Sequence, residues 1–247
     1  LNDPYSVYYN KKETKGLYES TGGEYSGIGA VMSQNTETGV ITLVQIYKDS
    51  PAEKAGLKAN DILYKVEGKE VTGKDLSKVV SKVKGEKGTT VELTVLRGED
   101  AKEVTVTATR DTVQAQTIEY KMMDDKIGYI RVSEFDTVTY DQYKEALDDL
   151  EKQGMTGLVV DLRNNPGGSL STVCDMLDLM LPKGLIVYTE DKNGKKTEMK
   201  SDEEHQFTKP LAVLVNGNSA SASEIYSGAI QDYGIGKIVG TQTYGKG

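Results

Sequence analysis

The spacing of apolar residues changes near residue 113, and this change constrains the fold more than any other feature of the sequence. Between residues 24 and 112, short segments alternate apolar and polar residues, as half-buried antiparallel strands do. After residue 113, continuous apolar runs such as 157–162 and 211–215 alternate with helical patterns. This alternation is typical of an α/β sheet that is buried on both faces. The sequence therefore predicts a mostly β region followed by an α/β core.

The patterns also place the individual elements. In the first region, short helices around 50–55 and 75–83 interrupt five expected strands, at 27–32, 40–46, 62–66, 91–96 and 104–108. In the second region, helices are expected from about 140 to 154, from 169 to 181 and after Ser221. The strands expected there are 127–132, 157–162, 185–188, 211–215 and 237–240, with a charged hairpin region at 190–203.

Charge and cysteine usage exclude several classes of function. The net charge is −8 and the pI is about 4.9, which argues against nucleic acid and anionic membranes as partners, because both are bound through basic surfaces. The single cysteine, Cys174, cannot form an intramolecular disulfide and is expected to be a small buried apolar residue. The chain begins without Met and ends directly after a strand-like segment, so we expect it to be a piece of a longer protein.

Three serines occupy the turn between the strand at 211–215 and the helix that follows. Ser219, Ser221 and Ser223 alternate there with alanines. A serine at this place can be a nucleophile, because free N–H groups at a helix N-terminus can stabilise an oxyanion. The same residues also fit a capping box, Ser-x-x-Glu, which is a common way to begin a helix. This segment alone favours capping. Residues 216–221 are called the serine loop below.

A second polar turn follows the other central apolar strand. Residues 161–168, called the glycine loop below, read Asp-Leu-Arg-Asn-Asn-Pro-Gly-Gly. This loop should lie at the same edge of the sheet as the serine loop, where open α/β folds bind ligands. Gly167 and Gly168 can direct N–H groups at a substrate without obstruction by a side chain. A plain turn would favour the same residue types.

A serine nucleophile needs a base, and the sequence offers two candidates. His205 is the only histidine and lies in a charged stretch that is expected to be a solvated loop. Lys246 lies between glycines just after the strand at 237–240. A lysine acts as a base only when burial brings its pKa well below ~10.4. A lysine near a chain end is otherwise usually a solvated charge.

Taken together, these motifs resemble the C-terminal processing proteases, which are tail-specific serine peptidases with a Ser-Lys dyad and a PDZ domain. The resemblance extends over essentially the whole chain and implies a ClpP/crotonase-like α/β core that carries an inserted, mostly β PDZ domain. It divides the chain into a lead-in (1–23), the PDZ domain (24–112) and a protease core (113–247) that lacks its C-terminal end. The motifs that carry the resemblance are Ser-Ala-Ser-Ala-Ser-Glu-Ile at 219–225, Gly-Lys-Gly at 245–247, the glycine loop, and Asp-Ser-Pro-Ala-Glu-Lys-Ala-Gly-Leu at 49–57.

The resemblance implies a role for each matching residue. Ser221 would be the nucleophile and Lys246 the base, and the N–H of Ala222 would form the oxyanion hole together with Gly167 or Gly168. The family also has a glutamine shortly after Gly-Lys-Gly that holds the lysine, and the sequence stops before that position.

The PDZ resemblance implies a peptide site. The Gly-Ile-Gly-Ala segment, formed by Gly27, Ile28, Gly29 and Ala30, matches the loop whose N–H groups receive a peptide carboxylate while the peptide adds a strand to the sheet.

The function implied is an endopeptidase for proteins and peptides with apolar free C-termini, without a cofactor or metal. The family usually works outside the bacterial cytoplasm, anchored by an N-terminal segment that is not in this chain, and the resemblance allows a homo-oligomer. Two other classes stay open. One is a non-catalytic tail-binding scaffold with a degenerate core. The other is a crotonase-like acyl-thioester enzyme, for which the sequence shows no CoA-binding patch.

Overall fold

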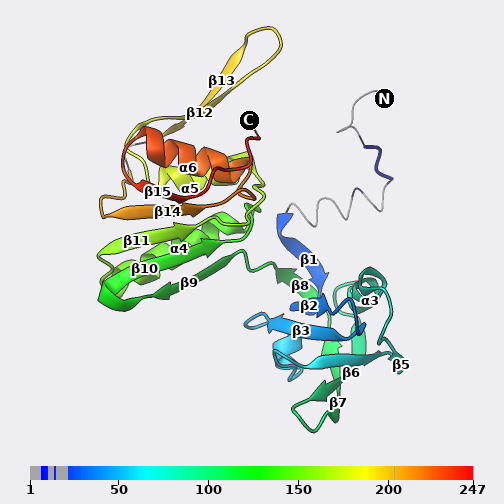
Figure 1. Cartoon of the computed structure of the whole chain (residues 1–247). Coiled ribbons are helices and arrows are strands. Elements are labelled where there is room, and N and C mark those ends of the chain that lie inside the picture. The colour runs from blue at the N-terminus through cyan, green and yellow to red at the C-terminus, as the bar shows by residue number, and fades with distance from the viewer. Residues whose placement is uncertain (1–6, 11–13, 15–21, 203, 247) are drawn as a thin grey trace. The chain divides into compact units, whose positions relative to one another are not determined.

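The structure is a computed structural model that describes residues 7–10, 14, 22–202 and 204–246. The chain forms two compact units (Figure 1). One consists of residues 24–115, and the other combines residues 1–23 with residues 116–247. Most of the expected lead-in at 1–23 lies outside the described residues.

The unit of residues 24–115 is built on a twisted antiparallel sheet with strand order β2-β3-β4-β6-β7. Strand β5 adds to β4, and strands β1 and β8 pair separately. Two short helices, α2 (Pro51–Lys54) and α3 (Leu76–Val83), accompany the sheet. The strands are β1 (Glu24–Gly27), β2 (Ala30–Gln34), β3 (Ile41–Ile46), β4 (Ile62–Val66), β5 (Lys69–Glu70), β6 (Thr90–Arg97), β7 (Lys102–Thr109) and β8 (Asp111–Gln114).

The alternation of apolar and polar residues along the strands explains this sheet. Ile41 and Leu43 on β3 and Leu93 on β6 are completely buried, while the neighbouring Thr42 is half-buried and Glu92 is exposed. Strand β2 is an edge strand, so one side of its backbone has no neighbouring strand within the sheet. An edge of this kind can accept an added strand.

The second unit is built on a five-stranded sheet with order β15-β14-β11-β10-β9. Its four strands from β15 to β10 run parallel, and β9 is antiparallel to β10. The strands are β9 (Ile118–Met122), β10 (Ile127–Val132), β11 (Gly157–Asp161), β14 (Leu211–Val215) and β15 (Lys237–Gly240). Strands β12 (Gly184–Glu190) and β13 (Lys196–Ser201) form a separate hairpin. The carboxyl ends of β11 and β14 lie side by side, so the loops that follow them share one edge of the sheet.

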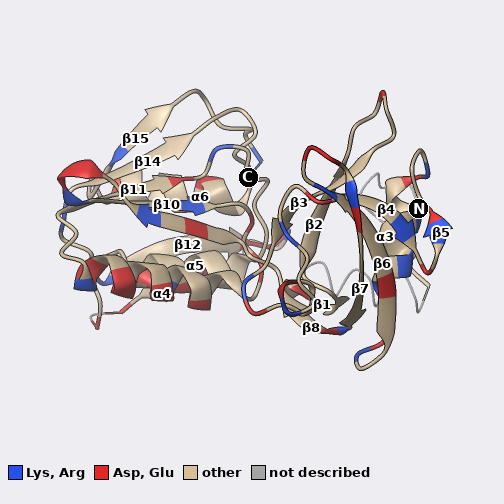
Figure 2. Cartoon of the chain, turned by 90° about the horizontal axis from the view of Figure 1, so that it is seen from below, with Lys and Arg blue, Asp and Glu red and all other residues tan. Residues whose placement is uncertain are grey.

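Three helices cover one face of this sheet: α4 (Thr139–Lys152), α5 (Leu170–Asp178) and α6 (Ala222–Asp232). Helix α5 packs against both α4 and α6, so all three lie on the same face. Acidic residues, coloured red in Figure 2, recur along α4. The row Ile130, Val160 and Val213 is completely buried, but the neighbouring Tyr129 and Val159 of the opposite face are only half-buried. The helix-covered face is therefore buried as expected, and the opposite face is buried only in part among the described residues.

Several boundaries also differ from the sequence expectation. Strand β2 begins at Ala30 rather than at Gly27, because Ile28 and Gly29 form a loop. Helix α5 ends at Asp178, three residues earlier than expected. Residues 111–114 and 118–122 form strands that the apolar pattern does not predict, since both carry several polar residues.

Candidate active site

Ser221 lies in the sharp turn that joins β14 to α6. Its φ of 53° and ψ of −113° form a conformation that residues with a side chain rarely adopt. A strained strand-to-helix turn of this kind exposes the nucleophile of α/β-hydrolases, and the next N–H then faces the oxyanion. Ser221 is half-buried, and its neighbours Ala220 and Ala222 are buried and small. This backbone is therefore suited to present a reactive hydroxyl.

The other two serines of the motif serve the fold. Ser219 is fully buried, and its Oγ donates to the carbonyl of Leu162 at 2.7 Å. Ser223 is also fully buried, and its Oγ donates to the carbonyl of Asn165 at 3.0 Å. Both hydroxyls therefore attach the segment around Ser221 to the glycine loop.

The glycine loop begins at a buried carboxylate, that of Asp161, which pairs with the exposed Arg163. The Asp161 carboxylate accepts hydrogen bonds from the Arg163 guanidinium, at 2.6–3.1 Å, and from the Tyr129 hydroxyl at 2.7 Å. Burial raises the pKa of Asp161, but these donors outweigh it and lower the pKa below its ordinary value. Asp161 therefore stays ionised and fixes the start of the loop, as a structural rather than a proton-transferring carboxylate.

Asparagine side chains join the two loops. Asn164 Oδ1 accepts hydrogen bonds from the side-chain amides of Asn216 and Asn218, each at 3.0 Å. In return, Asn216 Oδ1 accepts the Asn164 N–H at 3.0 Å. The expectation that both loops meet at one sheet edge is met, and these amides set how they fit together.

The two glycines of the loop have different surroundings. Gly167 has φ +104°, and a Cβ placed there would lie 2.8 Å from Ser221 Cβ, so only glycine fits against the serine. Its N–H donates to Asn165 Oδ1 at 2.8 Å. Gly168 has φ +144°, and a Cβ there would overlap the carbonyl of Phe135. Gly168 is exposed, and within the described residues its N–H has no acceptor.

Ala222 offers a second unused donor. It is the first residue of α6, so its N–H has no partner inside the helix. Across the described ranges no loop oxygen accepts it either. The N–H groups of Gly168 and Ala222 thus follow Gly167 and Ser221, the two residues in close contact, and neither has an acceptor among the described residues.

Glu224 connects the serine loop with the segment after β15. Its carboxylate accepts N–H groups from Ser221 at 2.8 Å, Gly245 at 2.6 Å and Lys246 at 2.9 Å. Burial alone would raise the pKa of Glu224, but these backbone donors have the larger combined effect and lower it. The sequence predicts Glu224 only as the partner of Ser221 in a capping box. Its contacts with residues 245 and 246 depend on tertiary structure and have no signal in the sequence.

The two candidate bases are both exposed. The main-chain N–H of Lys246 is tied to Glu224, but no hydrogen bond joins its side chain to Ser221 among the residues that the structure describes. His205 likewise makes no hydrogen bond with Ser221 in the described part of the chain. The structure thus brings the backbone of Lys246 to the site and gives no support to His205.

A cavity of about 720 Å³ lies beside the serine loop. Amide side chains, a proline and an exposed tyrosine surround it, and it is large enough for several residues of an extended peptide. The lining residues are Asn164, Pro166, Asn218, Ala220, Tyr244, Gly245 and Lys246.

In the other unit, the loop between β1 and β2 presents free N–H groups. The carbonyl of Ile28 accepts the Ala52 N–H at 2.7 Å, and the carbonyl of Gly29 accepts the Tyr47 N–H at 2.9 Å. The N–H groups of Ile28 and Gly29 have no acceptor among the described residues. Gly29 has φ +76°, and a Cβ there would overlap the Ser50 side chain. The loop is therefore fixed through its carbonyls and leaves its donors open.

A small apolar groove lies next to these donors. It encloses about 140 Å³ between the edge strand β2 and helix α3. Lys84 Nζ lies 4.4 Å from the centre of the Tyr25 ring at this groove. The pKa of Tyr25 is raised, mainly by burial and to a smaller extent by the nearby Tyr47. The lining residues are Tyr25, Ile28, Gly29, Ala30, Met32, Val80, Val83 and Lys84.

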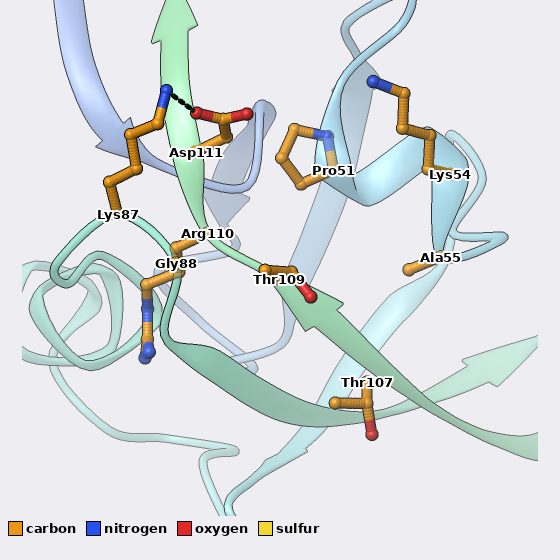
Figure 3. A pocket seen from close by; sticks show the side chains of 9 residues that line it. All are labelled: Pro51, Lys54, Ala55, Lys87, Gly88, Thr107, Thr109, Arg110 and Asp111. Atoms are coloured by element: carbon orange, nitrogen blue, oxygen red, sulfur yellow. Dashed lines mark ion pairs between the residues drawn. The ribbon is translucent and has the colours of Figure 1, made fainter.

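A further hollow of about 390 Å³ lies elsewhere in this unit (Figure 3). Two of its three cationic side chains, Lys87 and Arg110, are already engaged. Lys87 forms an ion pair with Asp111, and Arg110 donates to the carbonyls of Val83, Thr90 and Lys82. The charge of Arg110 therefore supports the fold and leaves little for a ligand.

Sequence profiles of two families match parts of this chain. The sequence profile described as "Peptidase family S41" matches residues 126–247, and the profile described as "PDZ domain" matches residues 42–97. The carboxy-terminal processing protease CtpA of Bacillus subtilis (strain 168) is 38% identical over 248 residues, which are 100% of this chain and 53% of that protein. A probable CtpA-like serine protease of Staphylococcus haemolyticus (strain JCSC1435) is 40% identical over 251 residues, again 100% of this chain and 49% of that protein.

Among solved structures, the photosystem II D1 C-terminal processing protease is 28% identical, with a TM-score of 0.54, over 100% of this chain and 68% of that chain. The chain spans about half the length of the curated relatives it matches. The sequence-based family assignment and fold class are confirmed. The chain therefore belongs to peptidase family S41, and it carries the PDZ domain that its sequence predicts.

Proposed function

We propose that the protein containing this chain is a serine endopeptidase that cleaves by a Ser-Lys dyad after its PDZ domain has bound an apolar C-terminal tail. The observation that carries the proposal is the conformation of Ser221, which lies at a strained helix N-terminus directly before Ala222, whose N–H has no acceptor among the described residues. Family membership and the name of the B. subtilis relative support a processing protease.

The acylation step follows from this arrangement. Neutral Lys246 removes the proton from Ser221 Oγ, and Oγ attacks the scissile carbonyl carbon. The carbonyl π electrons move to oxygen, and the N–H groups of Gly168 and Ala222 stabilise this oxyanion. Gly168 is the better candidate than Gly167, because the Gly167 N–H already donates to Asn165. Collapse of the intermediate expels the amine, which takes the proton from the Lys246 ammonium.

Deacylation repeats these roles with water. Lys246 removes a proton from a water molecule, which attacks the acyl carbon, and the Ser221 oxygen leaves and regains a proton. The protons move only among the two side chains, the substrate and this water, so these steps use no metal or cofactor.

In the PDZ unit, the N–H groups of Ile28 and Gly29 receive the terminal carboxylate, together with the flanking Gly27 and Ala30. The peptide backbone then pairs with the edge of β2, and the small groove takes an apolar side chain. The 140 Å³ of this groove suits a small or medium aliphatic residue.

Covalent labelling of the full-length protein tests the nucleophile. A fluorophosphonate probe should label Ser221, identified by peptide mass spectrometry, and a peptide substrate with an apolar C-terminus should slow the labelling. Labelling at another serine, or none in a protein that cleaves peptides, would contradict the assignment.

One observation favours the second candidate function, a tail-binding scaffold without catalysis. The Lys246 side chain is exposed and has no hydrogen bond with Ser221 in the described part of the chain. A scaffold would bind tail peptides with the same affinity but would neither react with the probe nor release a shortened product.

The proposed location is outside the bacterial cytoplasm, with a membrane anchor in the parent protein and assembly into homo-oligomers. It rests on the family, and the two relatives compared above are bacterial. Among the described residues, no helix combines the length and the hydropathy needed to cross a bilayer. Fractionation of cells that express the full-length protein would test the location.

A further inference from the structure

Asn165, in the glycine loop, is a completely buried polar residue whose side chain bonds in two directions. Its Nδ2 donates to the carbonyl of Val132 at 2.9 Å, at the end of β10. Its Oδ1 accepts the Gly167 N–H at 2.8 Å. One amide therefore attaches the glycine pair to the sheet, and it does so with both its donor and its acceptor.

The backbone carbonyl of Asn165 bonds to the opposite loop. It accepts the Ala220 N–H at 3.1 Å and the Ser223 hydroxyl at 3.0 Å. These two donors lie on either side of Ser221 and Ala222 in the sequence. Asn165 thus contacts both the loop that offers the Gly168 N–H and the loop that offers the Ala222 N–H.

We infer that Asn165 is a positioning residue that sets the separation of the Gly168 and Ala222 N–H groups and so completes the oxyanion hole. This inference rests on the proposed function and adds to it a residue that does not touch the substrate. By holding the Gly167 N–H, the Asn165 side chain also turns the next peptide so that Gly168 supplies the donor. A shift of about 1 Å in such a group can lower a rate by on the order of a hundredfold.

The chemistry of the contacts explains why an asparagine is needed. Asp at this position would bring a carboxylate oxygen against the carbonyl of Val132 and bury a charge. Leu would fill the space but leave the Val132 carbonyl and the Gly167 N–H without partners. Only a side chain with one donor and one acceptor on a short stem meets both groups.

The test uses the full-length protein with Asn165→Ala and the matched control Ser227→Ala. Ser227 is buried in the same helix as Ala222, and its Oγ donates to the Ser223 carbonyl at 2.9 Å, so the control also loses a buried hydrogen bond. Steady-state kinetics on a tail peptide should show kcat of Asn165→Ala lowered on the order of ten- to a hundredfold, with KM within about twofold. Ser227→Ala should keep kcat within about twofold.

A kcat of Asn165→Ala equal to that of the control, measured well below the Tm of both variants, would overturn the inference. If Ser221→Ala is inactive in the same assay, the proposed function then stands without it. Cleavage by Ser221→Ala would overturn the proposed function and this inference together.

If Asn165→Ala does not fold, Ser223→Ala decides the question. This variant removes only the hydroxyl that donates to the Asn165 carbonyl. We expect kcat to fall severalfold against Ser227→Ala with KM unchanged, and a kcat equal to that of the control would overturn the inference.

Discussion

The main-chain N–H groups of Ser221 and Lys246 donate to the same oxygen atom, Oε2 of Glu224, at 2.8 Å and 2.9 Å. The two residues are far apart in the sequence, and one carboxylate holds both backbones. Hydrogen bonds to a charged group are about twice as strong as neutral ones, so this link fixes the segment that carries Lys246 relative to the serine loop.

The first prediction concerns this carboxylate. Glu224→Gln keeps the size of the side chain but replaces one acceptor oxygen with an NH₂ group, which cannot accept an N–H. We expect the free energy of unfolding to fall by about 1–3 kcal/mol at pH 7 and kcat on peptide substrates to fall at least tenfold in the full-length protein. Denaturant unfolding and steady-state kinetics measure these two effects.

The effect of Glu224→Gln on stability should depend on pH in a definite direction. The folded pKa of Glu224 is lowered, so its stabilisation is present above the unfolded value of about 4.3 and is lost as the pH falls through the folded pKa. The stability difference between wild type and variant should therefore shrink below pH 4. The exposed Glu204 offers a control, since Glu204→Gln should change neither stability nor kcat. A difference that grows on acidification would contradict the assignment.

The second prediction separates the two candidate bases. In the full-length protein, Ser221→Ala and Lys246→Ala should each abolish peptide cleavage and leave tail binding intact, because each removes only a reacting group. His205→Ala should keep nearly full activity, since His205 is exposed and makes no hydrogen bond with Ser221 in the described part of the chain. A time course of peptide cleavage followed by chromatography measures the activity. A Ser221→Ala protein that still cuts would show that the nucleophile is misassigned.

The neighbouring serine provides a control for this series. Ser219→Ala removes the hydroxyl that donates to the Leu162 carbonyl, a buried hydrogen bond worth about 1 kcal/mol. We expect a lower Tm with activity reduced much less than in Ser221→Ala. Equal loss of activity in the two variants would mean that the motif acts only through stability.

The third prediction concerns the PDZ loop. Peptides with a free C-terminal carboxylate and a small apolar last residue should bind with a Kd of roughly micromolar size, and amidation should weaken binding at least tenfold. Gly29→Val should prevent binding, because a side chain there overlaps Ser50 and requires φ +76°. Isothermal titration with acid and amide forms of one peptide checks this. Equal affinities for both forms would exclude a carboxylate-binding loop.

The sequence predicts the parts of this protein that depend on local pattern. Apolar runs such as residues 211–215 locate the central strands, and small residues around Ser221 indicate a sharp turn. The family motifs then predict the site residues, because each motif is short and contiguous. The strand at Asp111–Gln114 shows the opposite case, since it exists through pairing with β1 and its own residues are mostly polar.

The part of the site that the sequence does not predict depends on contacts between residues far apart in the chain. Asn165 looks like an ordinary turn residue in the sequence, and its importance comes from contacts with Val132 and Ser223, which lie more than thirty residues away on either side. The sequence likewise does not show whether Gly167 or Gly168 would donate its N–H to the oxyanion, because both are unhindered glycines. The choice depends on which N–H the Asn165 side chain already holds.

The last prediction concerns the pH dependence of folding and rests on Asp136. This carboxyl group is 6% exposed, and burial, aided by the nearby charge of Glu134, raises its pKa to about 6. The folded protein therefore holds this proton more tightly than the unfolded chain, where the pKa of an aspartate is about 3.9. Stability should fall as the pH rises from about 4 to about 6 and level off above, with a contribution on the order of 1 kcal/mol after screening by solvent.

Asp136→Asn should remove this contribution, because asparagine keeps the shape of the side chain and carries no charge at any pH. The Tm of wild type and variant, measured between pH 4 and pH 7, should therefore converge at pH 4 and separate in favour of the variant above pH 6. Asp175 also has a raised pKa, through burial and the charge of Asp178, but it is present in both proteins and cancels in the difference. Glu134→Gln should reduce the separation only partly, since burial is the larger cause. A Tm difference that is constant across this range would show that Asp136 ionises in the folded protein at its ordinary pKa.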